Sequence, residues 1–252
     1  MRRTAAVCVA VLVVAGCSGA DSRPRFSDAR SLADAAVAAT HAARSAKFTT
    51  DVSTGALVSH GRGQAEFGPD GTALVMTTDF VGEPLELRLV GGKLYAKVPD
   101  SARDQVAGGK PWVTVSPDGN DPLSEVLGGS LSQLAEQNDP ARTLDQVRTA
   151  GTLTASDTTT LDGVAATHYR VDVDLAELGT RLPAGLPPDA HPAAEVPLDL
   201  WLDDADRPLQ LTLDLTPATT GGARITARYS GWGSPVSVTA PAPDEVGTLI
   251  GG

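Results

Sequence analysis

The sequence has few cysteines, few aromatic residues and no hydrophobic run long enough to span a membrane. Its two cysteines are Cys8 and Cys17, and aromatic residues make up 4% of the chain. The main apolar run, Ala5 to Val14, is much shorter than the roughly 20 residues that a transmembrane helix needs. Positive charge is also scarce: the chain has 20 lysines and arginines but 31 aspartates and glutamates, so the net charge is −11. The basic residues form no cluster along the chain, which argues against a nucleic-acid partner.

The N-terminus has the three parts of a secretory signal peptide. Arg2 and Arg3 precede the apolar run, and small residues lead into Cys17. A cysteine in this place resembles the bacterial lipobox, which implies cleavage after residue 16 and a diacylglycerol on the Cys17 sulfur. The alternative is a plain secretory signal in which Cys17 happens to lie near the cleavage site. We expect a signal peptide at 1–16, a lipidated tether at 17–27 and a single domain at 28–250.

Processing of this kind would leave the mature protein without a usable thiol. Cys8 would leave with the signal peptide, and Cys17 would carry the lipid. Disulfides, thiol catalysis and a cysteine-based metal site are then excluded. The domain must depend on its apolar core, and a chain of this length is long enough to bury one.

The domain begins with a predicted helix and continues with strands. Asp28 to Ala46 is rich in alanine, and Ser27 or Asp28 can cap its start. After Lys47 the hydrophobic period changes to two, which is typical of strands with one apolar and one polar face. Gly91-Gly92 and Asp162-Gly163 are hairpin signals. The predicted strands cover about 74–80, 85–89, 94–98, 112–115, 152–161, 169–175, 198–202, 209–215, 225–229 and 236–238.

The region from Asp121 to Gly151 interrupts the strands with two predicted helices. Asp121-Pro122 and Asp139-Pro140 each combine a capping aspartate with a proline at the first helical position. The pair Gly128-Gly129 is expected to kink or split the first of these helices. The proline-rich stretch from 179 to 197 is expected to be a surface loop.

These elements predict an α+β fold. Strands with one apolar and one polar face are typical of an antiparallel sheet that is covered on one side and wet on the other. About ten such strands accumulate a strong twist. We therefore expect a large, curved antiparallel sheet, a half-barrel, with helices covering its concave apolar face.

An ordered set of short motifs resembles the LppX/LprA/LprF/LprG lipoproteins of mycobacteria and their relatives. The resemblance extends from about Ala29 to Val246. After the lipobox, the matching segments are Gly91-Gly92-Lys93-Leu94-Tyr95-Ala96-Lys97, Gly163-Val164 with His168-Tyr169-Arg170-Val171, Leu200-Trp201-Leu202-Asp203 with Arg207-Pro208, and Tyr229-Ser230-Gly231-Trp232-Gly233-Ser234-Pro235-Val236.

The resemblance implies a fold similar to that of the periplasmic carrier LolA and a role in lipid binding. In this family, the space between sheet and helices can hold the acyl chains of a lipid or lipoglycan, and members are thought to move such lipids toward the outer envelope. The family has no catalytic motif and no cofactor to carry over. The resemblance implies an acyl lipid or glycolipid as ligand, a membrane contact through the anchor, and an exporter as a candidate partner. We expect a monomer.

The apolar strand faces are the candidate walls of a lipid pocket, and their alternative role is ordinary core. They comprise Leu74, Met76, Phe80, Leu87, Leu89, Leu198, Leu200, Leu211 and Leu213.

Other polar and aromatic residues point to no catalytic or metal site. His41, His60, His168 and His191 are scattered and lack metal-binding spacing. The aspartates at 203, 204 and 206 lack the glycine and distal glutamate of a calcium loop, so we expect a solvated hairpin turn. Trp201 falls on the polar side of its strand. Either that face is covered there, or the alternation slips by one residue.

The function predicted from the sequence is that of an extracytoplasmic, membrane-anchored envelope lipoprotein, not an enzyme. It would bind acyl chains of a lipid or lipoglycan and carry or present it toward the outer envelope. The alternative is an accessory or sensory lipoprotein that contacts an exporter or signalling partner and binds no lipid. A hydrolase is a third hypothesis, for which the sequence has no motif.

Overall fold

The computed structural model describes most of the predicted domain. The described residues are 25–55, 57–68, 71–80, 83–115, 138–179, 182, 186, 194–219 and 221–248. Cys8, Cys17, His191 and the predicted helix that begins at Asp121 lie outside them. No helix among the described residues is long and apolar enough to cross a membrane.

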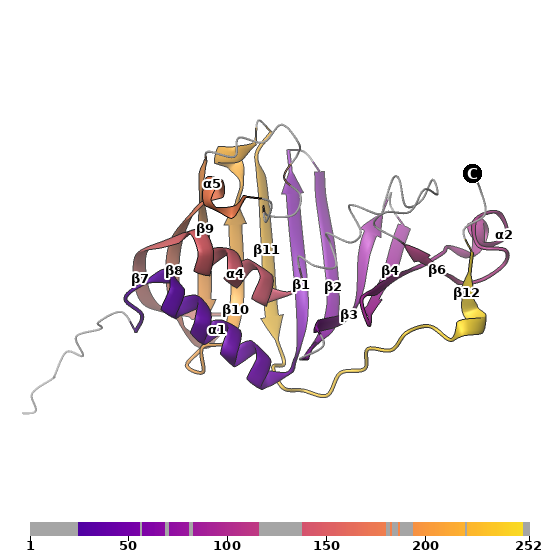
Figure 1. The fold of residues 1–252 in the computed structure, drawn as a ribbon, viewed down its shortest axis with the longest axis horizontal. Helices are drawn as coiled ribbons and strands as arrows, with labels where there is room; N and C mark the ends of the chain where they lie inside the picture. Colours follow the sequence, from indigo (N-terminus) through magenta and orange to yellow (C-terminus); the bar gives the residue numbers. More distant parts are fainter. Residues whose placement is uncertain are drawn as a thin grey trace, which may run out of the picture.

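The described strands form one large open sheet (Figure 1). In chain order they are β1 (Ser45–Thr54), β2 (Leu57–Gly68), β3 (Gly71–Phe80), β4 (Glu83–Val90), β5 (Lys93–Lys97), β6 (Trp112–Val115), β7 (Gly151–Leu161), β8 (Val164–Asp174), β9 (Glu195–Leu202), β10 (Pro208–Asp214), β11 (Ala223–Ser230) and β12 (Val246–Gly247).

The sheet joins two antiparallel halves. Strands β1 to β6 pair in sequence order, as do β7 to β11, and the pairing of β1 with β11 unites the halves. Only the short β12 pairs in parallel, with β6. The curved, mostly antiparallel sheet with a few helices confirms the predicted fold class. The alternation did not reveal β1 and β2 as strands, because Gly61 and Gly63 replace apolar residues on the face that Phe48 and Met76 occupy.

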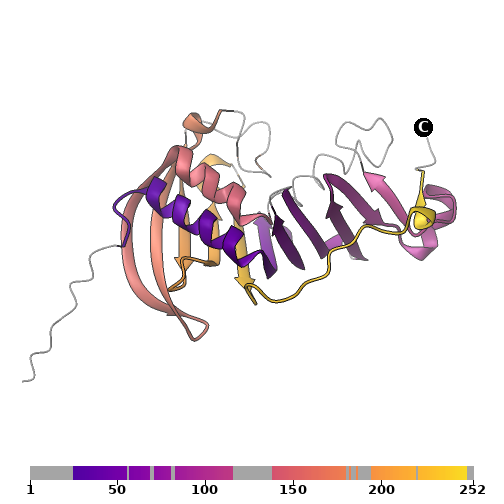
Figure 2. The same cartoon turned by 60° about the horizontal axis from the view of Figure 1, so that its bottom comes forward.

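Two helices lie across one half of the sheet. These are α1 (Ala29–Ala43) and α4 (Pro140–Ala150), which pack on each other and lie over the side formed by β7 to β11 (Figures 1 and 2). The short helix α5 (Leu175–Leu178) follows β8, and α2 (Arg103–Val106) lies near β6 and β12.

The caps of these helices were partly foreseen. Asp28 caps α1 by accepting a hydrogen bond from the Ser31 backbone N–H, and Asp139 caps α4 in the same way through Ala141. The prediction that the first helix reaches Ala46 was wrong by three residues. Arg44 adopts a left-handed conformation with φ of 68°, which ends α1 and turns the chain into β1.

After β11 the chain runs past the strand ends as a mostly extended segment that finishes in a 3₁₀ turn at Pro243–Glu245 (Figure 2). Residues 231–245, which we call the C-terminal strap, run along one end of strands β1 to β5 toward β12 (Figure 2). Side chains fasten it: Gln64 Nε2 donates to the Ser237 carbonyl at 2.8 Å, and Arg88 Nη1 donates to the Thr239 carbonyl at 3.3 Å. The predicted strand at 236–238 was therefore wrong. Prolines at 235 and 241 lack an N–H for ladder pairing.

Candidate functional site

The predicted pocket residues lie on the apolar face of the sheet. Seven are buried in the core: Leu74, Met76, Leu87, Leu198, Leu200, Leu211 and Leu213. Leu89 is half-buried, and Phe80 is the last residue of β3, with its side chain outside the described part.

The helices fill the space above this face in one half of the sheet. Leu32 and Ala36 of α1 and Leu144 and Val147 of α4 have no exposed surface and belong to the same apolar cluster as the strand residues. Among the described residues, this interior is packed like the core of any domain.

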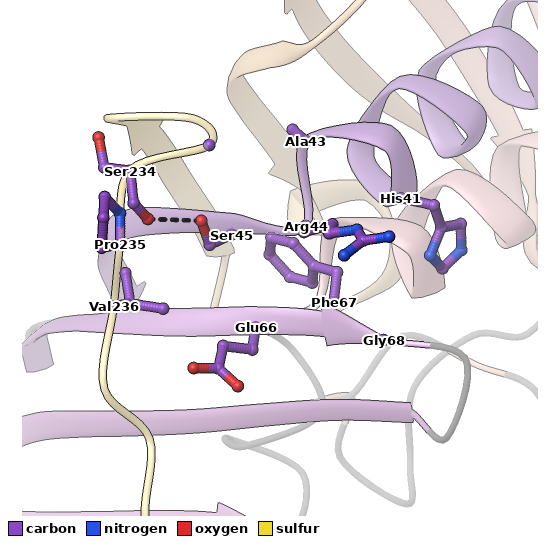
Figure 3. A pocket seen from close by; sticks show the side chains of 11 residues that line it. His41, Ala43, Arg44, Ser45, Glu66, Phe67, Gly68, Ser234, Pro235 and Val236 are labelled. Atoms are coloured by element: carbon purple, nitrogen blue, oxygen red, sulfur yellow. Dashed lines mark hydrogen bonds between the residues drawn. The ribbon is translucent and has the colours of Figure 1, made fainter.

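A cavity of about 1060 Å³ opens where α1 ends (Figure 3). Three segments surround it: the end of α1 with the start of β1, the end of β2, and the first part of the C-terminal strap. Its lining residues are His41, Ala43, Arg44, Ser45, Glu66, Phe67, Gly68, Gly233, Ser234, Pro235 and Val236. None of the predicted pocket residues lines it. We call it the α1-end cavity.

Hydrogen bonds between distant segments hold the walls of this cavity together. The Phe67 N–H donates to the Arg44 carbonyl at 2.7 Å, and the Gly233 N–H donates to the Ser45 carbonyl at 2.9 Å. Ser45 Oγ donates to the Ser234 carbonyl at 2.6 Å (Figure 3). The opening is therefore part of the folded framework.

The cavity combines an apolar wall with a charged surround. Phe67 is buried except for 3% of its surface, whereas His41, Arg44 and Glu66 are exposed. Arg44 and Glu66 form no ion pair within the described part of the chain, so both charges face solvent. A cavity with apolar walls and a few polar groups at its edge suits an amphipathic ligand.

An aromatic cluster lies behind the cavity wall. The Trp232 ring centroid is 5.8 Å from that of Phe67 and 5.7 Å from that of Tyr229. The Trp232 indole N–H donates to the Pro208 carbonyl at 2.9 Å, which fixes the ring between β10 and β11. Trp232 thus connects the cavity wall to the buried core.

Tyr229 carries a buried hydroxyl without a hydrogen-bond partner in the described part of the chain. Its residue is only 4% exposed. Burial raises the pKa of Tyr229 far above its ordinary value, and the negative charge of Asp139 adds to the effect. The hydroxyl is therefore neutral and available to donate one hydrogen bond.

A buried polar cluster near the start of α4 ties that helix to the sheet. The Thr50 hydroxyl is hydrogen bonded to Asn138 Oδ1, and Asn138 Nδ2 contacts Met76 Sδ at 3.5 Å. Thr72 binds the Asp139 carboxylate in a similar way. These contacts join β1 and β3 to the two residues that precede α4.

Trp201 lies on the polar face of β9, and that face is covered at this position. Its ring stacks on that of His168 with centroids 4.3 Å apart and planes 6° apart. His168 also meets the carboxylates of Asp199 at 2.6 Å and Asp157 at 3.4 Å. The alternation of buried and exposed residues along β9 is therefore regular, and the His168 imidazole covers the Trp201 indole on the polar face. Tyr169 takes the core position beside it and is 1% exposed.

Among the described residues, His41 and His60 are exposed, and the aspartate turn is structural. His41 lies at the α1-end cavity, and His60 Nδ1 is 2.6 Å from Asp51. Asp203 accepts hydrogen bonds from the Ala205 and Arg207 backbone N–H groups, as expected for a hairpin turn. No cluster of three metal-ligating side chains is found among the described residues.

The fold and the cavity together define a protein with a half-barrel sheet, helices over its apolar face and an opening at the end of α1. No family model and no curated protein matches the chain. Among solved structures, the lipoprotein LppX of Mycobacterium tuberculosis is 16% identical, with 84% of this chain and 98% of that one covered and a TM-score of 0.54. LprF of Mycobacterium bovis is 17% identical, with 85% and 97% covered and a TM-score of 0.52. The chain therefore has the LppX/LprF-like fold, which confirms the resemblance at the level of fold.

Sequence reasoning did not find the α1-end cavity. Its walls come from segments that are distant in the chain, and Phe67 lies in a strand without clear alternation. One signal was available. The run from Tyr229 to Val236 was a matching motif, and it forms the turn and strap that close one side of the cavity.

Proposed function

We propose that this protein is an envelope lipoprotein that binds the acyl chains of a lipid or lipoglycan and carries or presents it toward the outer envelope. The observation that carries the proposal is the α1-end cavity, with its apolar wall and charged surround, on an LppX/LprF-like fold. Its volume of about 1060 Å³ is in the range of small-molecule sites. Burial of apolar surface would provide the affinity, at about 25 cal/mol per Å² before the costs of association.

The proposal includes an anchor at Cys17 on the extracytoplasmic face of a membrane. The described part begins at Arg25, a few residues after Cys17, so a lipidated Cys17 would hold the domain close to that surface. The domain would act as a carrier without turnover, which predicts tolerance of different acyl chains.

A second candidate function is supported by the filled core. Leu32, Leu144 and Leu198 are at most 1% exposed, so an acyl chain at these positions would displace core side chains. A lipoprotein that contacts an exporter or a signalling partner and binds no lipid needs no such space.

Native mass spectrometry with lipid extraction separates these functions. All described strands and core residues lie between 25 and 248, so a soluble chain that lacks residues 1–17 keeps every described contact. Expressed in a mycobacterial host, it should carry an added mass that extracts as an acyl lipid. An apo mass alone, also after incubation with envelope lipids, would favour the partner-binding function.

A cavity-filling variant tests the position of the ligand. Ala43 lines the α1-end cavity, whereas its exposed neighbour Ala42 does not. Ala43→Phe should reduce the lipid-bound fraction several-fold, because the added ring occupies apolar space, while Ala42→Phe should retain it. Equal lipid content in both variants would move the ligand away from this cavity.

A further inference from the structure

A second cavity lies beside residues 230–232, and its lining includes both core-face residues, Phe48 and Tyr229, and charged residues of the polar face. It is a groove of about 870 Å³ bordered by β1, β2 and β11, by the β7–β8 turn and by the β9–β10 turn. Lys47, Arg62 and Arg228 line it, and they alternate along their strands with residues of the core face such as Phe48 and Tyr229. Their side chains therefore stand on the polar face of the sheet. We call this cavity the basic groove.

The strand register gathers the cations of this groove around one residue. Thr49 is paired with Arg62 on β2 and with Arg228 on β11, and Lys47 lies two residues before it on the same face of β1. Neighbouring strands are about 4.8 Å apart, so three positive side chains surround the exposed Thr49 hydroxyl. Along the sequence these residues are far apart, and their clustering is a product of the fold.

Two of these cations form no ion pair within the described residues. Arg228 pairs with Asp51 at 2.6 Å, and Arg207, which also lines the groove, pairs with Asp203 at 2.7 Å. Lys47 and Arg62 have no ion-pair partner in the part of the chain that the structure describes, although Asp162 lines the groove at its turn. Like charges that are close together on a sheet destabilise it. In a chain with a net charge of −11, such a pair of free cations favours an anionic ligand.

The groove and the α1-end cavity meet at one aromatic pair. Trp232 lines the groove, Phe67 lines the α1-end cavity, and their ring centroids are 5.8 Å apart. Residues 230–236 run between the two cavities, with 230–232 on the groove and 233–236 on the other side. One amphipathic molecule could therefore contact both.

We infer that the basic groove binds the phosphate of a phospholipid headgroup through Lys47, Arg62 and the Thr49 hydroxyl. The ammonium and guanidinium groups donate charge-assisted hydrogen bonds to phosphate oxygens. The identification of the phosphate as part of a lipid rests on the proposed function, in which acyl chains occupy the α1-end cavity. Free inorganic phosphate has the same anionic chemistry, so the experiment must separate the two sources.

Calorimetric titration of the soluble chain lacking residues 1–17 tests this inference. The probes are dihexanoyl phosphatidylglycerol, dihexanoylglycerol and inorganic phosphate, with the two lipids below their micelle concentrations. The groove variant combines Lys47→Gln with Arg62→Gln. The control combines Lys93→Gln with Lys110→Gln, which removes the same charge from exposed residues that line neither cavity.

The phosphatidylglycerol probe should bind at least about tenfold more tightly than either other probe, because hydrogen bonds to charged groups add to acyl burial. The groove variant should lose this advantage, and the control variant should keep it. Equal phosphatidylglycerol affinity in the groove variant and the wild type would overturn the inference. If inorganic phosphate binds as tightly as the phospholipid, the inference that the bound phosphate belongs to a lipid is overturned.

The same data separate failure of the groove from failure of the proposed function. If dihexanoylglycerol and phosphatidylglycerol both bind and neither depends on Lys47 and Arg62, acyl binding stands and the groove inference falls. If phosphate and phosphatidylglycerol bind with equal affinity through Lys47 and Arg62, the groove holds an anion, but its acyl-lipid role is lost.

Discussion

At the scale of single residues, the three tryptophans show how the fold assigns different roles to one residue type. Trp201 is covered by His168, and Trp112 is covered by Arg88, whose guanidinium lies 4.3 Å from the ring centroid. Cations and imidazoles above an indole shield it from water on the polar face of a sheet. Trp232 lines the basic groove and packs on Phe67 of the α1-end cavity, so it is placed to contact a ligand in the described part of the chain.

The buried hydroxyl of Tyr229 leads to a prediction about stability. Because this hydroxyl has no hydrogen-bond partner among the described residues, Tyr229→Phe should raise the free energy of unfolding by about 1 kcal/mol in the ligand-free protein. Urea denaturation of the soluble chain measures the change. Tyr169→Phe is the comparison, since Tyr169 is also buried but its hydroxyl interacts with the Thr167 side chain, so its loss should destabilise the protein. Equal destabilisation by both changes would show that Tyr229 has a partner in solution.

At the scale of elements, the hairpin of β4 and β5 depends on a charge cluster on its polar face. Glu86 accepts hydrogen bonds from Arg88 Nη2 at 2.8 Å and from Lys97 Nζ at 3.0 Å. Burial raises the pKa of Glu86, but these hydrogen bonds outweigh it, so the pKa lies below its ordinary value. A carboxyl whose pKa is lowered by folding stabilises the protein above its unfolded pKa, and this stability is lost as the pH falls through the folded pKa.

We therefore expect Glu86→Gln to destabilise the protein near neutral pH and to have little effect in acid. The expected loss is about 0.5–1 kcal/mol, because solvent reaches the cluster and screens it. Denaturant titrations at a series of pH values measure the difference from wild type. Glu195→Gln removes an exposed carboxylate without an ion pair in the described structure and should have little effect at any pH. A loss that is independent of pH would assign the effect of Glu86 to packing.

Element prediction from the sequence succeeded where a pattern was local. The Asp139-Pro140 signal marks the start of α4, and Gly91-Gly92 and Asp162-Gly163 mark hairpin turns, because caps and turns depend on neighbouring residues. Prediction failed for β1 and β2, where glycines allow Phe48 and Met76 to lie close above the strand. A Cβ at Gly63 would lie 2.6 Å from Phe48 Cζ. That constraint comes from tertiary packing and leaves no periodic pattern.

At the scale of the whole molecule, the proposed anchor determines where the protein works. Cys17→Ser should move the protein from the membrane fraction to the soluble extracytoplasmic fraction, because one serine removes the only proposed attachment point for the acyl chains. Fractionation with labelled fatty acid measures both location and lipid. Cys8→Ser is the control and should leave the protein lipidated. Retention of the Cys17 variant in membranes would mean that the domain binds them by another surface, and the basic groove is then the first candidate.

The sequence alone determined the layout of this protein. Its apolar alternation and turn signals are local features, and they suffice to predict a curved antiparallel sheet with helices on its apolar face. Only the tertiary structure decided where a ligand could bind. The α1-end cavity and the basic groove form where α1, β1, β2, β11 and the C-terminal strap converge, and the register alone places Lys47 and Arg62 on either side of the Thr49 position. Contacts between residues so distant in the chain leave no pattern that a single sequence can show.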